Sequence, residues 1–92
     1  MLHKIICKLN KILKDRKKGI ISHKEAFRKI QAVEVPADLP IDDWKAAMNK
    51  HNLALAILYK ADYVSRGRRY SHALEISKMY YDNATDIYGK AA

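Results

Sequence analysis

A chain of 92 residues, 49% of them hydrophobic, is one small domain at most. The single Cys7 excludes an internal disulfide framework, and no Cys/His cluster suggests zinc, so a reducing cytoplasm fits best. The net charge of +8 is confined to residues 1–31, where ten lysines and arginines outnumber two acids, and this predicts a polyanionic or acidic partner, or a membrane surface.

Residues 1–33 are predicted to form two short basic helices. In the first, aliphatic residues recur every three or four positions opposite a row of lysines, and Gly19 marks its end. The motif "SHKE" is a capping box in which Ser22 caps the second helix and Glu25 reaches back. Because lysines interrupt the apolar residues, we expect neither a signal peptide nor a membrane span.

Residues 34–41 form the clearest break, since Pro36 and Pro40 forbid a continuous helix and favour an extended crossing. Residues 42–92 are then expected to form a long antiparallel helical hairpin. Its middle segment, "LALAIL" at 53–58, is apolar on all sides and must be covered from several directions. The predicted fold is a single all-α domain over residues 1–92, and its high apolar content favours a homo-oligomer.

The turn of this hairpin, "YVSRGRRYSH" at 63–72, is rich in arginine. Arginine forks match phosphate oxygens two at a time, and the following helix begins nearby. We therefore interpret Arg66, Arg68 and Arg69 as candidate phosphate ligands, with Tyr63 or Tyr70 stacking on a base. The alternative is a solvated connector whose charges pair with neighbouring acids.

The basic first helix supplies secondary candidates for phosphate binding, Lys8 and Lys11. Three interpretations of this helix stay open: contact with nucleic acid phosphates, contact with an anionic membrane, or packing on neighbouring helices with its lysines in water. The last is the default, because so small a protein needs the apolar stripe of this helix for its core.

Signals for catalysis are weak. Arg66 and His72 resemble the Arg/His signature of HEPN ribonucleases, but Gly67 stands where a polar residue often follows the arginine. No nucleophile elbow, Walker loop, dinucleotide fingerprint or metal-ligand spacing is visible in the sequence. We expect a protein that is not an enzyme and that uses no cofactor or metal.

The hairpin also resembles that of phage anti-CBASS sponge proteins over about twenty of the 92 residues. Ser65-Arg66 matches the turn, and the following helix matches at Met79, Tyr80, Tyr81, Asn83 and Ala84. The resemblance implies a small helical oligomer, encoded by a phage and active in the bacterial cytoplasm, that sequesters cyclic oligonucleotide second messengers. Of the ligand residues, only Arg66 aligns with a family position.

A second hypothesis comes from the charge of residues 1–31. In this interpretation the chain is a small basic inhibitor or accessory protein that binds nucleic acid or a host protein complex.

Overall fold

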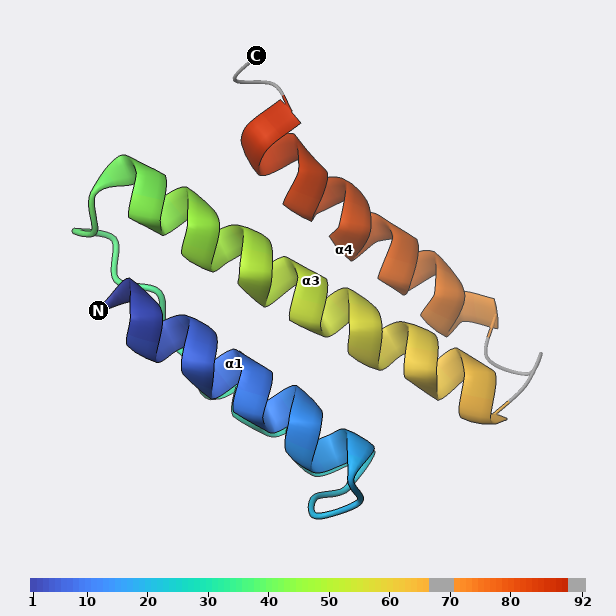
Figure 1. Cartoon of the computed structure of the whole chain (residues 1–92). Coiled ribbons are helices and arrows are strands. Elements are labelled where there is room, and N and C mark those ends of the chain that lie inside the picture. The colour runs from blue at the N-terminus through green and yellow to red at the C-terminus, as the bar shows by residue number, and fades with distance from the viewer. Residues whose placement is uncertain (67–70, 90–92) are drawn as a thin grey trace.

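The computed structural model describes residues 1–66 and 71–89, which fold into four helices (Figure 1). The helices are α1 (Leu2–Lys17), α2 (His23–Ala32), α3 (Ile41–Arg66) and α4 (Ser71–Gly89). The described ranges contain no strand, so the predicted all-α fold is confirmed. The C-terminal end of α3 adjoins the start of α4 and the two helices run antiparallel, as expected for a helical hairpin (Figure 1).

Helix α1 ends at a glycine, as its sequence predicts. Gly19 has a φ of 79°, in the left-handed region that favours glycine. The Gly19 amide donates to the Arg16 carbonyl, and the Ile20 amide donates to the Asp15 carbonyl at 2.9 Å. These two bonds form a Schellman motif, which satisfies carbonyls that the end of a helix leaves without partners.

Both ends of α2 are fixed by side chains. The Ser22 hydroxyl accepts a hydrogen bond from the Glu25 amide at 3.1 Å, which confirms the Ser22 half of the predicted box, while the Glu25 carboxylate pairs with Arg28. At the other end, His51 of α3 donates from Nε2 to the Ile30 carbonyl at 3.0 Å. This bond connects the last turn of α2 to the middle of α3.

The segment between α2 and α3 crosses the end of the molecule (Figure 1). It is extended only up to Pro36, and a turn at 37–38 follows, in which the Leu39 amide donates to the Pro36 carbonyl at 3.5 Å. The predicted extended crossing is therefore confirmed in its first part. Helix α3 then begins directly after Pro40, whose carbonyl accepts from the Trp44 amide at 2.9 Å. Asp42 and Asp43 occupy the first turn of α3, where negative charge favours the helix dipole.

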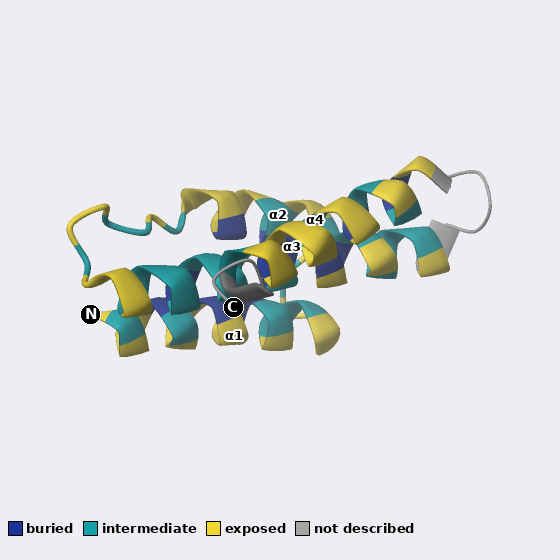
Figure 2. Ribbon diagram, turned by 90° about the horizontal axis from the view of Figure 1, so that it is seen from above, coloured by how far each residue is buried: buried dark blue, intermediate teal, exposed yellow. Residues whose placement is uncertain are grey.

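One core unites α1, α2 and α3, and buried positions face inward on each helix (Figure 2). Its buried members are Ile5, Leu9, Ile12, Ala26, Ile30, Ala47, Ala54, Leu55 and Leu58. The apolar stripe of α1 is therefore used for packing, as expected. The segment at 53–58 is also covered as predicted, except that Ile57 is 41% exposed.

Helix α4 is added to this three-helix core as an outer layer. Within the described residues it packs against α3 and makes no close backbone approach to α1 or α2. Three small side chains of α4, Ala73, Ser77 and Ala84, are buried in that contact. One side of α3 consequently lies open between α1 and α4.

None of the helices, over the residues that the structure describes, combines the length and the apolar character needed to cross a membrane.

Candidate functional site

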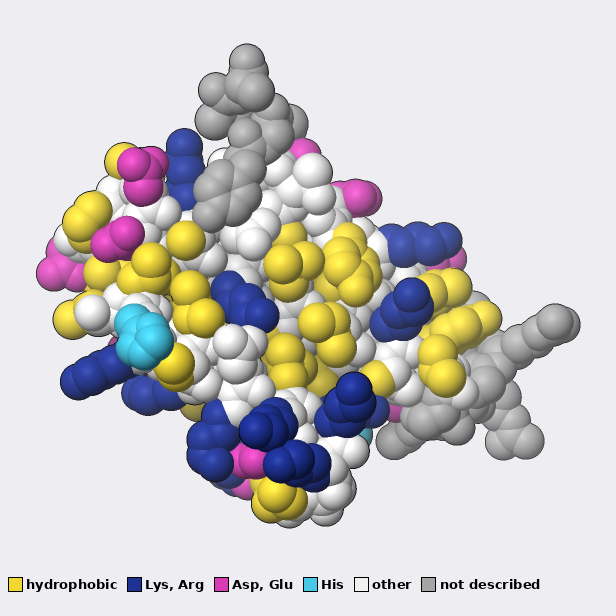
Figure 3. Space-filling model, viewed as in Figure 1, with side chains coloured by type: hydrophobic (Ala, Val, Ile, Leu, Met, Phe, Trp, Pro, Cys, Tyr) yellow, Lys and Arg dark blue, Asp and Glu magenta, His cyan; other side chains and the backbone are white. Residues whose placement is uncertain are grey.

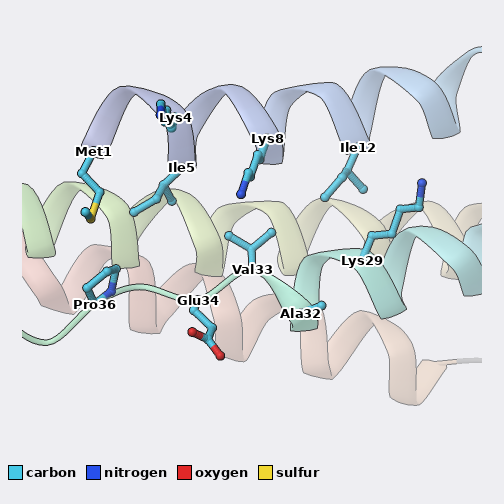
Figure 4. A pocket seen from close by; sticks show the side chains of 10 residues that line it. All are labelled: Met1, Lys4, Ile5, Lys8, Ile12, Lys29, Ala32, Val33, Glu34 and Pro36. Carbon is cyan, nitrogen blue, oxygen red and sulfur yellow. The ribbon is translucent and has the colours of Figure 1, made fainter.

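A groove of about 560 Å³ runs between α1 and the C-terminal part of α2 with its following segment (Figure 4). We call it the lysine groove. Its lining residues are Met1, Lys4, Ile5, Lys8, Ile12, Lys29, Ala32, Val33, Glu34 and Pro36.

Helical periodicity explains how α1 contributes both charge and apolar surface to the lysine groove. Lys4 and Lys8 are one turn apart on α1 and are exposed. Ile5 and Ile12 lie on the adjoining face, where they also enter the core. The same helix therefore provides the apolar floor and part of the charged rim.

The opposite wall depends on where α2 ends. Lys29 stands in the last turn of α2, and the chain becomes extended from Val33 onward, toward Pro36. Val33 already has an extended backbone, with a ψ of 115°, and Pro36 disfavours helical geometry at Val35, so the chain leaves the helix axis here. Val33 thereby faces α1, and Lys8 extends toward it (Figure 4).

The lysine groove is electropositive. Its lining contains three lysines and one carboxylate, that of Glu34, and the Glu34 side chain points away from α1 (Figure 4). Among the described residues, none of Lys4, Lys8 and Lys29 belongs to an ion pair. Their ammonium groups are thus available to an anion, and the apolar floor suits the flat or aliphatic part of the same ligand.

The structure separates the two lysines singled out from the sequence. Lys8 lines the lysine groove, whereas Lys11 does not and instead pairs with Asp15 at 3.4 Å. Sequence reasoning missed Lys4 and Lys29. The one-turn spacing of Lys4 and Lys8 was a usable signal, but Lys29 is brought to the groove by tertiary packing alone.

The arginine-rich turn falls largely outside the described residues. Arg68, Arg69 and Tyr70 lie outside the described ranges, and Arg66 is described only as the last residue of α3. Tyr63 is half-buried near the C-terminal end of α3 and is not among the residues that line the lysine groove. The structure therefore does not bring Tyr63 together with Lys8.

A chain of aromatic rings crosses the molecule from α2 to α4. The centroids of Phe27 and Tyr59 lie 4.6 Å apart in an edge arrangement, and Tyr59 stacks on Tyr80 at 5.7 Å. Burial raises the pKa of the Tyr59 hydroxyl above its usual value, and the nearby Tyr80 and Asp62 raise it further. These tyrosines act as packing residues, as their helical spacing predicts.

His23 connects three helices. Its Nδ1 accepts from Arg16 Nε of α1 at 3.3 Å, and its Nε2 lies 3.9 Å from an Asp62 carboxylate oxygen of α3. His72, the other member of the ribonuclease-like pair, is exposed in the first turn of α4. Over the described ranges, His, Cys, Asp and Glu side chains form no group of three suited to a metal ion.

Comparison of the chain with protein-family models, with curated proteins and with solved structures finds no match. The geometry and charge of the molecule itself are therefore the basis for a functional proposal.

Proposed function

We propose that this chain is a non-enzymatic binding protein that sequesters cyclic oligonucleotide second messengers, as a phage-encoded anti-defence factor in the bacterial cytoplasm. The observation that carries the proposal is the lysine groove, in which Lys4, Lys8 and Lys29 surround an apolar floor. The resemblance of the hairpin to sponge proteins supplies the ligand class.

The lysine groove suits a compact polyanion with hydrophobic faces. Its volume of about 560 Å³ lies within the roughly 300–1,000 Å³ typical of small-molecule sites. A cyclic dinucleotide carries two phosphates and two bases, so it requires a few convergent cations and apolar contact area. Lys8 and Lys29 offer the cations from opposite walls, and Val33 and Ile12 offer the apolar contact.

The arginines Arg66, Arg68 and Arg69 remain candidate phosphate ligands in this proposal, with Tyr63 or Tyr70 as base-stacking partners. Tyr63 does not line the lysine groove, so the proposal keeps two sets of candidate residues, those of the arginine turn and those of the lysine groove. Substitutions that affect one site and spare the other distinguish them.

The experiment that tests the ligand class is native mass spectrometry of the purified protein with cyclic dinucleotides and trinucleotides, and with linear dinucleotides of the same bases. We expect whole-number additions of the cyclic ligand, and weaker addition of the linear form. If no cyclic nucleotide adds to the protein at tens of micromolar ligand, the proposal is wrong.

A second candidate function rests on a different surface. Lys14, Lys17 and Lys18 are exposed at the C-terminal end of α1, beside the α1–α2 turn. Such a cluster favours binding of nucleic acid or of an acidic host protein. If the cluster binds nucleic acid, the logarithm of the binding constant falls linearly with the logarithm of the salt concentration. Fluorescence anisotropy with a labelled duplex, repeated at several salt concentrations, measures this slope. Absent or salt-insensitive binding rules out the nucleic-acid form.

A further inference from the structure

The side of α3 that α1 and α4 leave open carries a second groove, of about 450 Å³. We call it the α3 groove. Its lining residues are Arg16, Ile57, Lys60, Ala61, Val64 and Tyr81. Apolar side chains gather in this region between α1 and α4, with lysines and arginines around them (Figure 3). The α3 groove shares no residue with the lysine groove.

Large apolar side chains of the α3 groove are exposed to solvent. Val64 is 71% exposed, Ile57 is 41% exposed and Tyr81 is 37% exposed. Ile57 interrupts an otherwise covered apolar segment, so its exposure follows from the open side of α3. Covering such a contiguous surface is favourable, at about 25 cal/mol per Å² of apolar area removed from water.

The positive charge of the α3 groove indicates which side chains a binding partner must present to it. Lys60 is exposed beside Ile57 and Val64 and belongs to no ion pair among the described residues. Arg16 adds a second positive charge from α1. A complementary occupant therefore presents apolar and acidic side chains next to one another.

Helix α4 of this same chain has such a face. Its contact side toward α3 contains Ala73, Ser77 and Ala84, so helical periodicity places Glu75, Met79 and Asp82 on the opposite, outward side. All three of these outward residues are exposed, and Met79 is 48% exposed. This face combines one large apolar side chain with two carboxylates, those of Glu75 and Asp82, and the exposed Lys78 lies at its edge. Met79 and the two carboxylates are complementary to the apolar and positive side chains of the α3 groove.

We propose that the occupant is a second copy of the chain, in a two-fold dimer in which the outward face of each α4 docks in the α3 groove of its partner. The reciprocal exchange is the closed, isologous arrangement common among homodimers. Lys60 of one copy then lies near Asp82 of the other, and Met79 covers Ile57. The dimer does not rest on the proposed function, because the lysine groove is outside the contact.

Charge reversal with rescue tests this pairing. Sedimentation equilibrium of the full chain is expected to give a mass of two chains for the unsubstituted protein. Lys60→Glu and Asp82→Lys are each expected to weaken the dimer at least tenfold, since each places like charges in contact. The double variant Lys60→Glu with Asp82→Lys restores opposite charges and is expected to recover most of the loss.

Matched controls separate this contact from general effects of charge. Lys24→Glu and Asp38→Lys alter exposed residues outside the α3 groove and are expected to leave the dimer unchanged. Far-UV circular dichroism of each variant checks that it stays helical. A single-chain mass for the unsubstituted protein, a dimer insensitive to both reversals, or failure of the double variant to recover overturns the proposal. In the first case an acidic amphipathic helix of another protein becomes the occupant to test.

Discussion

The Ser77 hydroxyl of α4 donates a hydrogen bond to the Ala56 carbonyl of α3 at 2.7 Å, inside the contact between the two helices. Ser77 is 1% exposed, so this bond is shielded from water. A second bond runs the other way, from Asn49 Nδ2 of α3 to the Ala84 carbonyl of α4 at 2.8 Å. Because α4 packs on α3 alone within the described residues, these two bonds fix its register on the core.

Ser77→Ala is expected to lower the free energy of unfolding by about 0.5–1.5 kcal/mol, the net contribution of a typical hydrogen bond. For a chain of this size, each kcal/mol lowers Tm by roughly 4–8 °C. Thr85→Ala is the matched control, because the exposed Thr85 hydroxyl bonds to the Tyr81 carbonyl of its own helix at 3.0 Å. Thermal unfolding, monitored by circular dichroism, gives the Tm of the Ser77→Ala and Thr85→Ala variants. Equal losses in the two variants would contradict a special role for the buried bond.

Leu9 is fully buried among α1, α2 and α3, and its removal tests the shared core. Leu9→Ala is expected to lower the free energy of unfolding by about 2–5 kcal/mol, through lost burial and the cavity left behind. Leu13→Ala, at a half-buried position on the same helix, is expected to cost clearly less. Urea unfolding gives both values. A loss at Leu9 no larger than that at Leu13 would show that α1 is not anchored as described.

Gly19 has a positive φ, and a Cβ added there meets no atom within 4 Å. Gly19→Ala is therefore expected to cost about 1–2 kcal/mol from backbone strain alone. Gly19→Asn is expected to cost less, because asparagine tolerates the left-handed conformation better. Urea unfolding of the two variants checks the order, and an alanine variant as stable as the original would mean that the positive φ is not required.

The raised pKa of Tyr59 predicts a dependence of stability on alkaline pH. The folded state holds the Tyr59 proton more tightly than the unfolded state does. Its contribution is fully present below the unfolded pKa of about 10 and is lost as pH rises through the folded pKa. In an absorbance titration at alkaline pH, one tyrosine is expected to ionise after the exposed ones, and Tyr59→Phe is expected to remove that late step. If the late step persists in Tyr59→Phe, another tyrosine is the shielded one.

Local signals predicted most of the fold. The Gly19 stop, the Ser22 cap and the two prolines act within a few residues of themselves, so the helix boundaries follow from sequence. The apolar spacing of α1 likewise predicted its buried face. The open side of α3 was not predictable, because the uniformly apolar segment at 53–58 carries no information about which direction stays uncovered.

The candidate site was less accessible to sequence reasoning. Lys8 was identified from the charge of α1, but Lys29 is distant in sequence and joins it only when α2 packs against α1. Lys11 does not line the lysine groove, because it lies on another side of α1, where it forms an ion pair with Asp15. The sequence alone did not show which side of α1 faces the groove. The arginine turn stays a prediction, since Arg68 and Arg69 lie outside the described residues.

The lysine groove predicts which charges govern ligand affinity. Lys8→Ala together with Lys29→Ala removes cations from both walls while leaving the apolar floor. If each lysine makes a charge-assisted hydrogen bond of about 1.5–3 kcal/mol, the double variant is expected to bind a cyclic dinucleotide at least a hundredfold more weakly. Isothermal titration calorimetry at fixed salt measures the affinity.

The control for that variant is Lys14→Ala together with Lys17→Ala, which removes the same charge from exposed positions of α1 outside the lysine groove. It is expected to keep cyclic-ligand affinity within a fewfold, because neither lysine lines the lysine groove and salt weakens interactions between exposed charges. Loss in the control but not in the groove variant would move the site to the end of α1 and favour long nucleic acid. Loss confined to Arg66→Ala with Arg69→Ala would assign the ligand to the arginine turn, because those substitutions leave both walls of the lysine groove intact.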